Sequence, residues 1–163
     1  MSGAGAPTLP VEGAEGLAVA IVAASWHEQV MGGLLAGALR ACERAEAEVV
    51  AVVRVPGSFE LPIVAQQLAL GAVDAVIALG VVIRGGTPHF EFVCDAASSG
   101  LARVALETGV PVGFGLLTCD NEEQALERAG LPGSRESKGD EAACAALMTA
   151  VTLRRLREGG DGA

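Results

Sequence analysis

The chain has 163 residues, of which 51% are hydrophobic, so its length and composition are typical of one compact domain with a substantial core. Its formal net charge is −9, and no basic stripe is present, so we expect no nucleic-acid partner. The longest apolar runs are far shorter than the roughly 20 residues that a membrane-spanning helix needs, so we expect no membrane insertion.

The N-terminal segment, residues 1–16, contains Pro7 and Pro10 and predicts an extended arm that is either disordered or paired with a neighbouring subunit. It lacks the basic and apolar stretches of a secretory leader, so we expect a cytoplasmic protein. Residues 17–158 are predicted to form a single domain, and residues 159–163 a disordered tail.

Four aliphatic runs predict β-strands that are apolar on both faces, which is typical of a parallel sheet covered by helices on each side. The predicted strands are Leu17–Ala24, Glu48–Val55, Asp74–Ile83 and Pro111–Thr118. Helix-like segments alternate with them at His27–Ala45, Phe59–Leu70 and Phe90–Thr108. This alternation predicts a three-layer α/β/α sandwich with a central four-stranded parallel sheet and right-handed crossovers.

Two more helices are predicted after the fourth strand. Residues 120–123 offer an N-cap and an acidic first turn, and Gly130-Leu131-Pro132 would end that short helix. Residues Ala142–Leu156 predict the last helix, which carries arginines near its C-terminal end, where they suit the helix dipole.

The four cysteines are widely spaced and form no C-x-x-C pair, which argues against a zinc site and against a disulfide framework. They are Cys42, Cys94, Cys119 and Cys144. We interpret them as small core residues, and Cys94, near His89 in the sequence, is the one candidate for a catalytic thiol.

Unusual residues follow the predicted strands, at the edge where open parallel sheets bind ligands. Gly85-Gly86-Thr87 follows the third strand and precedes a helix, so its free N–H groups and hydroxyl suit a phosphate, although an ordinary turn is the alternative. The segment matches neither G-x-G-x-x-G nor a P-loop, so nucleotide binding is not indicated. His89 comes next and is the best acid-base candidate, whereas we favour a structural role for His27.

Aromatic and polar residues follow the first two strands. Trp26 is placed either to stack on a flat heterocycle or to pack in the core. Ser58, Phe59 and Glu60 open a helix and either hold a polyol or heterocycle or cap the helix.

Taken together, these segments resemble the lumazine synthases, with similarity from about Leu17 to Leu156. The matching segments are Trp26, Pro-Gly-Ser-Phe-Glu at 56–60, Val-Ile-Arg-Gly-Gly-Thr-Pro-His at 82–89, Phe-Gly-Leu-Leu-Thr at 114–118, Glu-Gln-Ala at 123–125, Arg-Ala-Gly at 128–130 and Lys-Gly at 138–139. The resemblance implies a flavodoxin-like fold. It also implies a transferase of riboflavin biosynthesis that condenses 5-amino-6-(D-ribitylamino)uracil with 3,4-dihydroxy-2-butanone 4-phosphate, giving 6,7-dimethyl-8-ribityllumazine, phosphate and water without metal or organic cofactor.

The resemblance also implies roles for individual residues. The residues expected to hold the pyrimidine and ribityl chain are Trp26, Ser58, Phe59, Glu60, Val81, Val82, Ile83 and Phe114. The residues expected around the phosphate are Gly86, Thr87, Arg128 and Lys138. His89 would carry protons, while Phe114 and Arg128 would come from the adjacent subunit. The linker at residues 131–137 is longer than in members that form icosahedral shells, so a homopentamer is expected.

Two other functions remain as alternatives. A non-catalytic flavin or lumazine carrier would use the same pocket, but it has no need of a phosphate site beside a proton donor. A flavodoxin-like signalling domain would normally show an acidic cluster at its strand ends, which Asp95 and Asp120 alone do not form.

Overall fold

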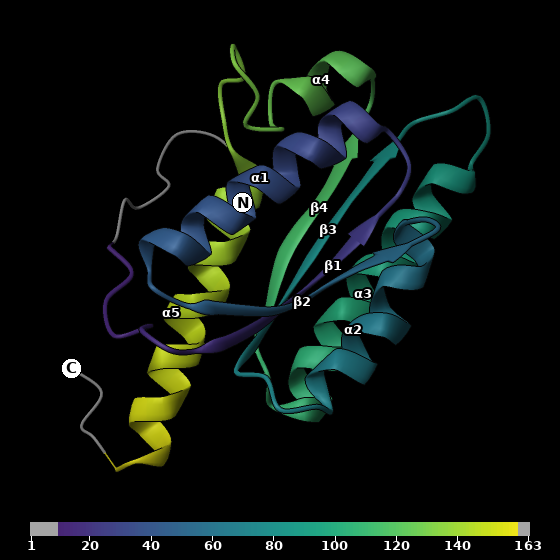
Figure 1. Ribbon diagram of the computed structural model, residues 1–163. Coiled ribbons are helices and arrows are strands. Elements are labelled where there is room, and N and C mark those ends of the chain that lie inside the picture. The colour runs from purple at the N-terminus through teal and green to yellow at the C-terminus, as the bar shows by residue number, and fades with distance from the viewer. Residues whose placement is uncertain (1–9, 160–163) are drawn as a thin grey trace.

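The computed structural model describes residues 10–159 and confirms the predicted architecture, a parallel sheet with the strand order β2-β1-β3-β4 (Figure 1). The strands are β1 (Ala18–Ala24), β2 (Glu48–Val55), β3 (Ala75–Ile83) and β4 (Val112–Cys119). The helices are α1 (Glu28–Arg44), the short 3₁₀ helix η1 (Ser58–Glu60), α2 (Leu61–Ala69), α3 (His89–Thr108), α4 (Glu122–Leu126) and α5 (Lys138–Arg157).

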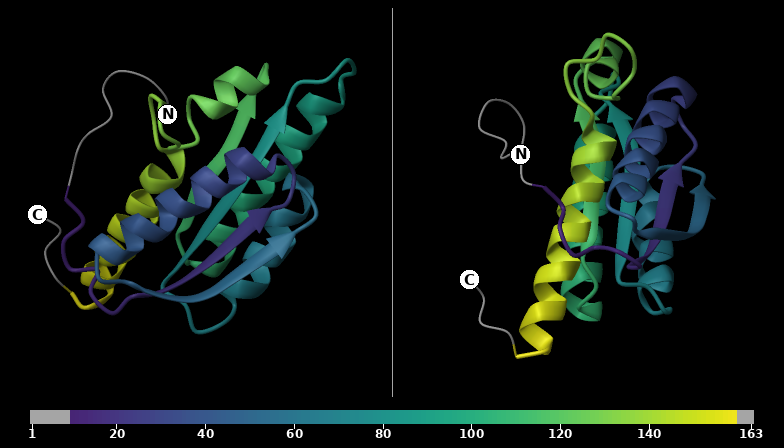
Figure 2. Two further views of the ribbon diagram at one scale, coloured as in Figure 1. Left: turned by 45° about the horizontal axis from the view of Figure 1, so that its top comes forward. Right: turned by 60° about the vertical axis from the view of Figure 1, so that its left-hand side comes forward.

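Two helical layers enclose the sheet. Helices α1 and α5 pack together on one face, and α2 and α3 on the other (Figures 1 and 2). The central strands β1 and β3 are covered on both sides, and the side chains of Val19, Ile21, Ile77 and Leu79 are fully buried. Their apolar runs therefore reflect burial on both faces of the sheet.

Strand β2 differs from the prediction of two covered faces. It lies at the edge of the sheet and alternates exposed with half-buried residues. Val50 and Val52 expose nearly half of their surface, at 47% and 45%. The prediction was wrong for this strand because a valine-rich run does not reveal which strand lies at an edge.

The strand order creates a switch point at the carboxyl ends of the central strands. The chain leaves β1 towards β2 on one side, whereas β3 pairs with β1 on the other side. The connections to the two sides therefore diverge at the carboxyl ends of β1 and β3, which is where such sheets bind ligands. The segments after β1 and β3 begin with Ser25 and Arg84.

Helix α5 begins at Lys138, earlier than the predicted Ala142. A glycine at position 139 resembles a helix breaker in the sequence, but packing requires it. A Cβ atom there would lie 1.9 Å from the carbonyl oxygen of Leu34 in α1. The glycine lets the two helices approach closely, and α5 therefore extends to the edge of the sheet where Lys138 lies.

The described part of the predicted N-terminal arm packs on its own chain. Ala14 is fully buried, and the guanidinium of Arg154 in α5 donates a hydrogen bond to the carbonyl oxygen of Gly13. Residues 1–9 of the arm and residues 160–163 of the predicted tail lie outside the described residues. Within residues 10–159, no helix is both long and apolar enough to cross a membrane.

Candidate functional site

The ends of β1, β2 and β3 bring together one group of predicted site residues, which we call the strand-end cluster: Trp26, residues 56–60 and residues 84–89. The hydroxyl of Ser25 donates to the carbonyl oxygen of Val55 at 2.8 Å and links the ends of β1 and β2. The indole of Trp26 lies against the turn, 3.8 Å from where a Cβ on Gly57 would stand. The end of β1 therefore contacts the turn after β2.

Two hydrogen bonds fix the turn that carries Ser58 and Glu60. The hydroxyl of Ser58 is buried and donates to the carbonyl oxygen of Val81 at 3.3 Å. The Glu60 carboxylate accepts a hydrogen bond from the N–H group of Gly57 at 2.8 Å. A Cβ on Gly80 would lie 2.8 Å from the Ser58 hydroxyl, so this glycine lets the turn approach β3.

Two aromatic rings of the cluster are open to solvent. Trp26 exposes 68% of its surface and Phe59 exposes 62%. Trp26 is therefore not a core residue, and the stacking alternative fits its position. Val81 is buried, whereas Val82 and Ile83, at the end of β3, are half-buried.

The loop between β3 and α3 is exposed from Gly85 to Pro88, and His89 is the exposed first residue of α3. No atom lies within 4 Å of the Cβ positions of Gly85 and Gly86, so a ligand has room to approach the backbone. Unpaired N–H groups at the start of a 20-residue helix attract anions. The geometry is compatible with a phosphate beside His89.

Arg84 anchors the base of this loop. Its Nε donates to Asp120 at 3.0 Å, its Nη1 donates to Glu91, and its guanidinium lies 4.2 Å from the centre of the Phe90 ring. The hydrogen bonds with Glu91 and then Asp120 raise the pKa of Arg84, so it remains cationic. The loop is thus tied to both β4 and α3.

The other predicted residues gather at β4 and α5, around an open pocket of about 370 Å³ that we call the β4–α5 pocket. Its lining residues are Phe114, Leu116, Leu117, Thr118, Cys119, Gln124, Arg128, Lys138, Glu141, Ala142 and Ala145. Phe114, Arg128 and Lys138 therefore share one pocket, and the Phe114 ring is 51% exposed. Residues of the strand-end cluster are absent from this lining among the described residues.

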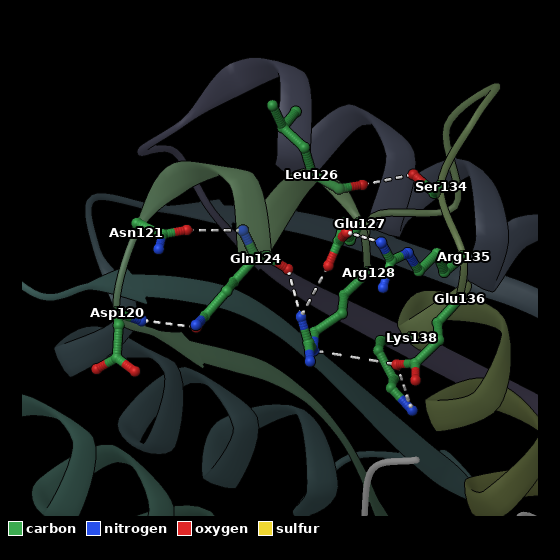
Figure 3. A network of polar contacts seen from close by, with 10 residues as sticks. All are labelled: Asp120, Asn121, Gln124, Leu126, Glu127, Arg128, Ser134, Arg135, Glu136 and Lys138. Carbon is green, nitrogen blue, oxygen red and sulfur yellow. Dashed lines mark hydrogen bonds and ion pairs between the residues drawn. The ribbon is translucent and has the colours of Figure 1, made fainter. Parts of the chain in front are cut away.

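Charged side chains dominate the polar part of the pocket (Figure 3). Arg128 donates from Nη1 to the carbonyl oxygen of Gln124 at 2.8 Å. Its ion pairs with Glu127 and Glu136 are long, at 3.9 Å and 4.0 Å. The ammonium group of Lys138 lies closer to its partners, 3.0 Å from Glu136 and 2.7 Å from Glu141.

Hydrogen bonds explain why Lys138 remains a cation although it is mostly buried. Desolvation lowers its pKa, but the hydrogen bonds to Glu141 and Glu136 outweigh this effect and leave the pKa raised. The chain segment from 127 to 138 folds back on itself, with the N–H groups of Arg135 and Glu136 bound to the Glu127 carbonyl and that of Lys138 to the Arg128 carbonyl. This turn brings both cations to one place.

The ion pairs of these two regions were not predicted from the sequence. Arg84, Glu91 and Asp120 form the anchor of the loop, and Glu136 and Glu141 hold the cations. Glu141 lies three positions after Lys138, a spacing that predicts an ion pair on a helix. That signal was missed because the predicted helix began after Gly139.

The candidate thiol receives no support from its surroundings. Desolvation and then the charge of Glu91 raise the pKa of Cys94, although Arg84 opposes them, and a raised pKa disfavours the reactive thiolate. Cys42 and Cys119 are buried as predicted, whereas Cys94 and Cys144 are only half-buried. Across residues 10–159, no group of three or more His, Cys, Asp or Glu side chains is placed to hold a metal ion.

Comparisons with known proteins all give one result. The family model described as 6,7-dimethyl-8-ribityllumazine synthase matches residues 16–154. A protein of that name from Renibacterium salmoninarum is 66% identical over 160 residues, covering 94% of this chain and 100% of the relative. Relatives of the same name from Kineococcus radiotolerans and Streptomyces avermitilis are 64% and 60% identical, covering 94% and 97% of this chain and 95% and 98% of their own lengths.

Proposed function

The chain belongs to the 6,7-dimethyl-8-ribityllumazine synthase family, and on that premise we propose that it condenses 5-amino-6-(D-ribitylamino)uracil with 3,4-dihydroxy-2-butanone 4-phosphate. The products are 6,7-dimethyl-8-ribityllumazine, phosphate and water. The chain is thus an enzyme, a transferase of riboflavin biosynthesis. The identity of 66% along the whole of a named relative carries this conclusion. The carrier alternative is not favoured, because the relatives bear the name of the enzyme.

We assign the organic part of the reaction to the strand-end cluster. Trp26 and Phe59 offer exposed apolar rings for the flat pyrimidine, and the hydrogen-bonded turn at residues 57–60 offers a rigid rim for it. Val81, Val82 and Ile83 complete this part. His89 stands at the exposed start of α3, where an imidazole can pass protons between the substrates as the imine forms, phosphate leaves and the ring closes.

We assign the phosphate to the loop at Gly86 and Thr87, together with Arg128 and Lys138. The loop offers backbone N–H groups and a hydroxyl with open space around them, whereas the two side chains offer cationic groups that are ion-paired in the single chain. Cationic side chains and backbone N–H donors together are a favourable arrangement for a phosphate, because charge-assisted hydrogen bonds are stronger than neutral ones.

We further propose that each active site forms between two subunits of a homopentamer. On one chain, Arg128, Lys138 and Phe114 line a pocket that contains no residue of the strand-end cluster, so a single chain does not join the two regions in one pocket. Association would bring the β4–α5 pocket of one subunit to the strand-end cluster of the next. Exposed apolar side chains favour such association. They include Val50, Val52, Ile63, Leu70, Phe92 and Leu106.

We propose that the protein acts in the cytoplasm. All four cysteines are free thiols in the structure, which is usual in a reducing compartment. We also propose that residues 17–158 act as a single domain.

The test of the reaction is the absorbance of the lumazine formed from the two purified substrates. The native protein should form it only when both substrates are present, and phosphate should be released in equal amount. Tight binding of the pyrimidine without any product would instead favour the carrier.

A further inference from the structure

The carboxylate of Glu136 occupies a position between the two cations assigned to the phosphate. Its Oε2 atom lies 3.0 Å from Nζ of Lys138 and 4.0 Å from Nε of Arg128 (Figure 3). No other carboxylate in the described chain forms ion pairs with both of these side chains. Glu136 therefore stands where an anion bridging Arg128 and Lys138 would stand.

This oxygen is shielded from solvent, which strengthens its effect on the neighbouring charges. The accessible surface of Glu136 Oε2 is below 1 Å², and the Lys138 side chain is only 13% exposed. Water and salt screen such a group much less than they screen an exposed one. Glu136 and Glu141 together offset the charges of Arg128 and Lys138, so an arriving phosphate meets little net positive charge.

The backbone holds Glu136 in this place. Its N–H group donates to the Glu127 carbonyl at 3.0 Å, and its carbonyl accepts a hydrogen bond from the N–H group of Gly130 at 3.0 Å. The neighbouring Ala129 and Ser137 form an antiparallel bridge. The carboxylate is thus a fixed part of the turn that carries the cations.

We propose that Glu136 is an internal competitor for the phosphate site, which weakens the binding of phosphate to Arg128 and Lys138. The proposal rests on the proposed function, in which these two cations receive the phosphate of the substrate. Phosphate is also a product, and a site with two uncompensated cations would retain it. A built-in carboxylate lets Arg128 and Lys138 exchange one anion for another when phosphate leaves.

The experiment measures the binding of inorganic phosphate to the assembled full-length protein by calorimetry, with Glu136→Gln as the principal variant. Glutamine keeps the size of the side chain and removes the charge. We expect phosphate to bind about fivefold tighter, the size of one partly screened ion pair. Inhibition of lumazine formation by added phosphate should become stronger by a similar factor.

Two further variants separate competition from other effects. Glu123→Gln removes the same charge from an exposed residue in the first turn of α4 and should leave phosphate affinity close to native. Glu136→Asp keeps the charge on a shorter side chain and should bind phosphate with an affinity between those of the native protein and Glu136→Gln. Melting curves of each variant establish that the fold is retained.

The result that would overturn the proposal is an unchanged or weaker phosphate affinity in Glu136→Gln. Weaker binding would mean that Glu136 serves to position Lys138. Arg128→Ala and Lys138→Ala test the proposed function separately, because both should weaken phosphate binding. Native affinity in these two variants would reject the phosphate site itself, whatever Glu136→Gln does.

Discussion

The strand-end cluster and the β4–α5 pocket differ in the chemical groups that they present. The cluster consists mainly of backbone turns, exposed rings and side chains bonded to the backbone, such as Ser58 to Val81, and its ion-paired Arg84 anchors the loop after β3. The pocket instead gathers charged side chains in ion pairs around Arg128 and Lys138. The difference implies a division of roles. The cluster would orient the substrates and transfer protons, and the pocket would supply positive charge for the phosphate.

Of the substitutions considered, removing the imidazole of His89 should lower the catalytic rate most. We expect His89→Ala to lower kcat about 100-fold, because general acid-base catalysis contributes factors of this order. The KM of either substrate should change little. Steady-state kinetics with both substrates provides the measurement, and His27→Ala is the matched control. A raised KM at unchanged kcat would assign His89 to binding.

Removing the guanidinium of Arg128 should affect the phosphate substrate selectively. Loss of a charge-assisted hydrogen bond predicts a KM for 3,4-dihydroxy-2-butanone 4-phosphate about 30-fold higher in Arg128→Ala. The KM of the pyrimidine should stay near its native value. Equal increases in both KM values would show that the pocket does more than hold charge.

The structure around these residues was predictable to different extents. The sandwich, the strands and the exposed loop at residues 85–88 followed from aliphatic runs and from glycines before a helix. The edge position of β2 did not, since which strand lies outermost depends on the pairing of the whole sheet. The cap of α4 by Asn121, which accepts a hydrogen bond from the N–H group of Gln124, was visible in the sequence.

The charged pocket was harder to predict than the cluster. Only the family resemblance assigned Arg128 and Lys138 together to the phosphate, because residues ten apart meet only when the turn between them is known. The acids around them were missed for the same reason. Gly139 concealed the start of α5, since its role lies in a contact with Leu34 that no local pattern reveals.

Two glycine variants, one beside Lys138 of the pocket and one in the loop of the strand-end cluster, should differ in thermal stability. Gly139→Ala places a Cβ against the Leu34 backbone, so we expect the apparent melting temperature to fall by about 6 °C, from an overpacking cost of about 2 kcal/mol. Gly86→Ala meets open space and should melt within about 1 °C of the native protein. Thermal scans at one protein concentration measure both. Equal melting temperatures would contradict the close contact of α5 with α1.

Added salt should change the KM of the phosphate substrate but not that of the pyrimidine, and this is the smallest of the expected effects. Raising ionic strength from 0.1 M to 1 M shortens the screening length from about 10 Å to about 3 Å. The KM of the phosphate substrate should therefore rise about threefold, in proportion to the lost attraction of partly exposed charges. The KM of the neutral pyrimidine should stay constant. Initial rates in sodium chloride check both, and parallel changes would reject the division.

The most direct test of the shared site is the mixing of two impaired subunits, assayed with the phosphate substrate at a concentration far below the KM of the Arg128→Ala variant. His89→Ala keeps its β4–α5 pocket, and Arg128→Ala keeps its strand-end cluster. If each site joins the two regions from adjacent subunits, refolding the variants together in equal amounts should restore about a quarter of the native activity, because about one interface in four pairs the intact regions. Mixed assemblies that contain both variants but are no more active than the two variants assayed separately would contradict the shared site.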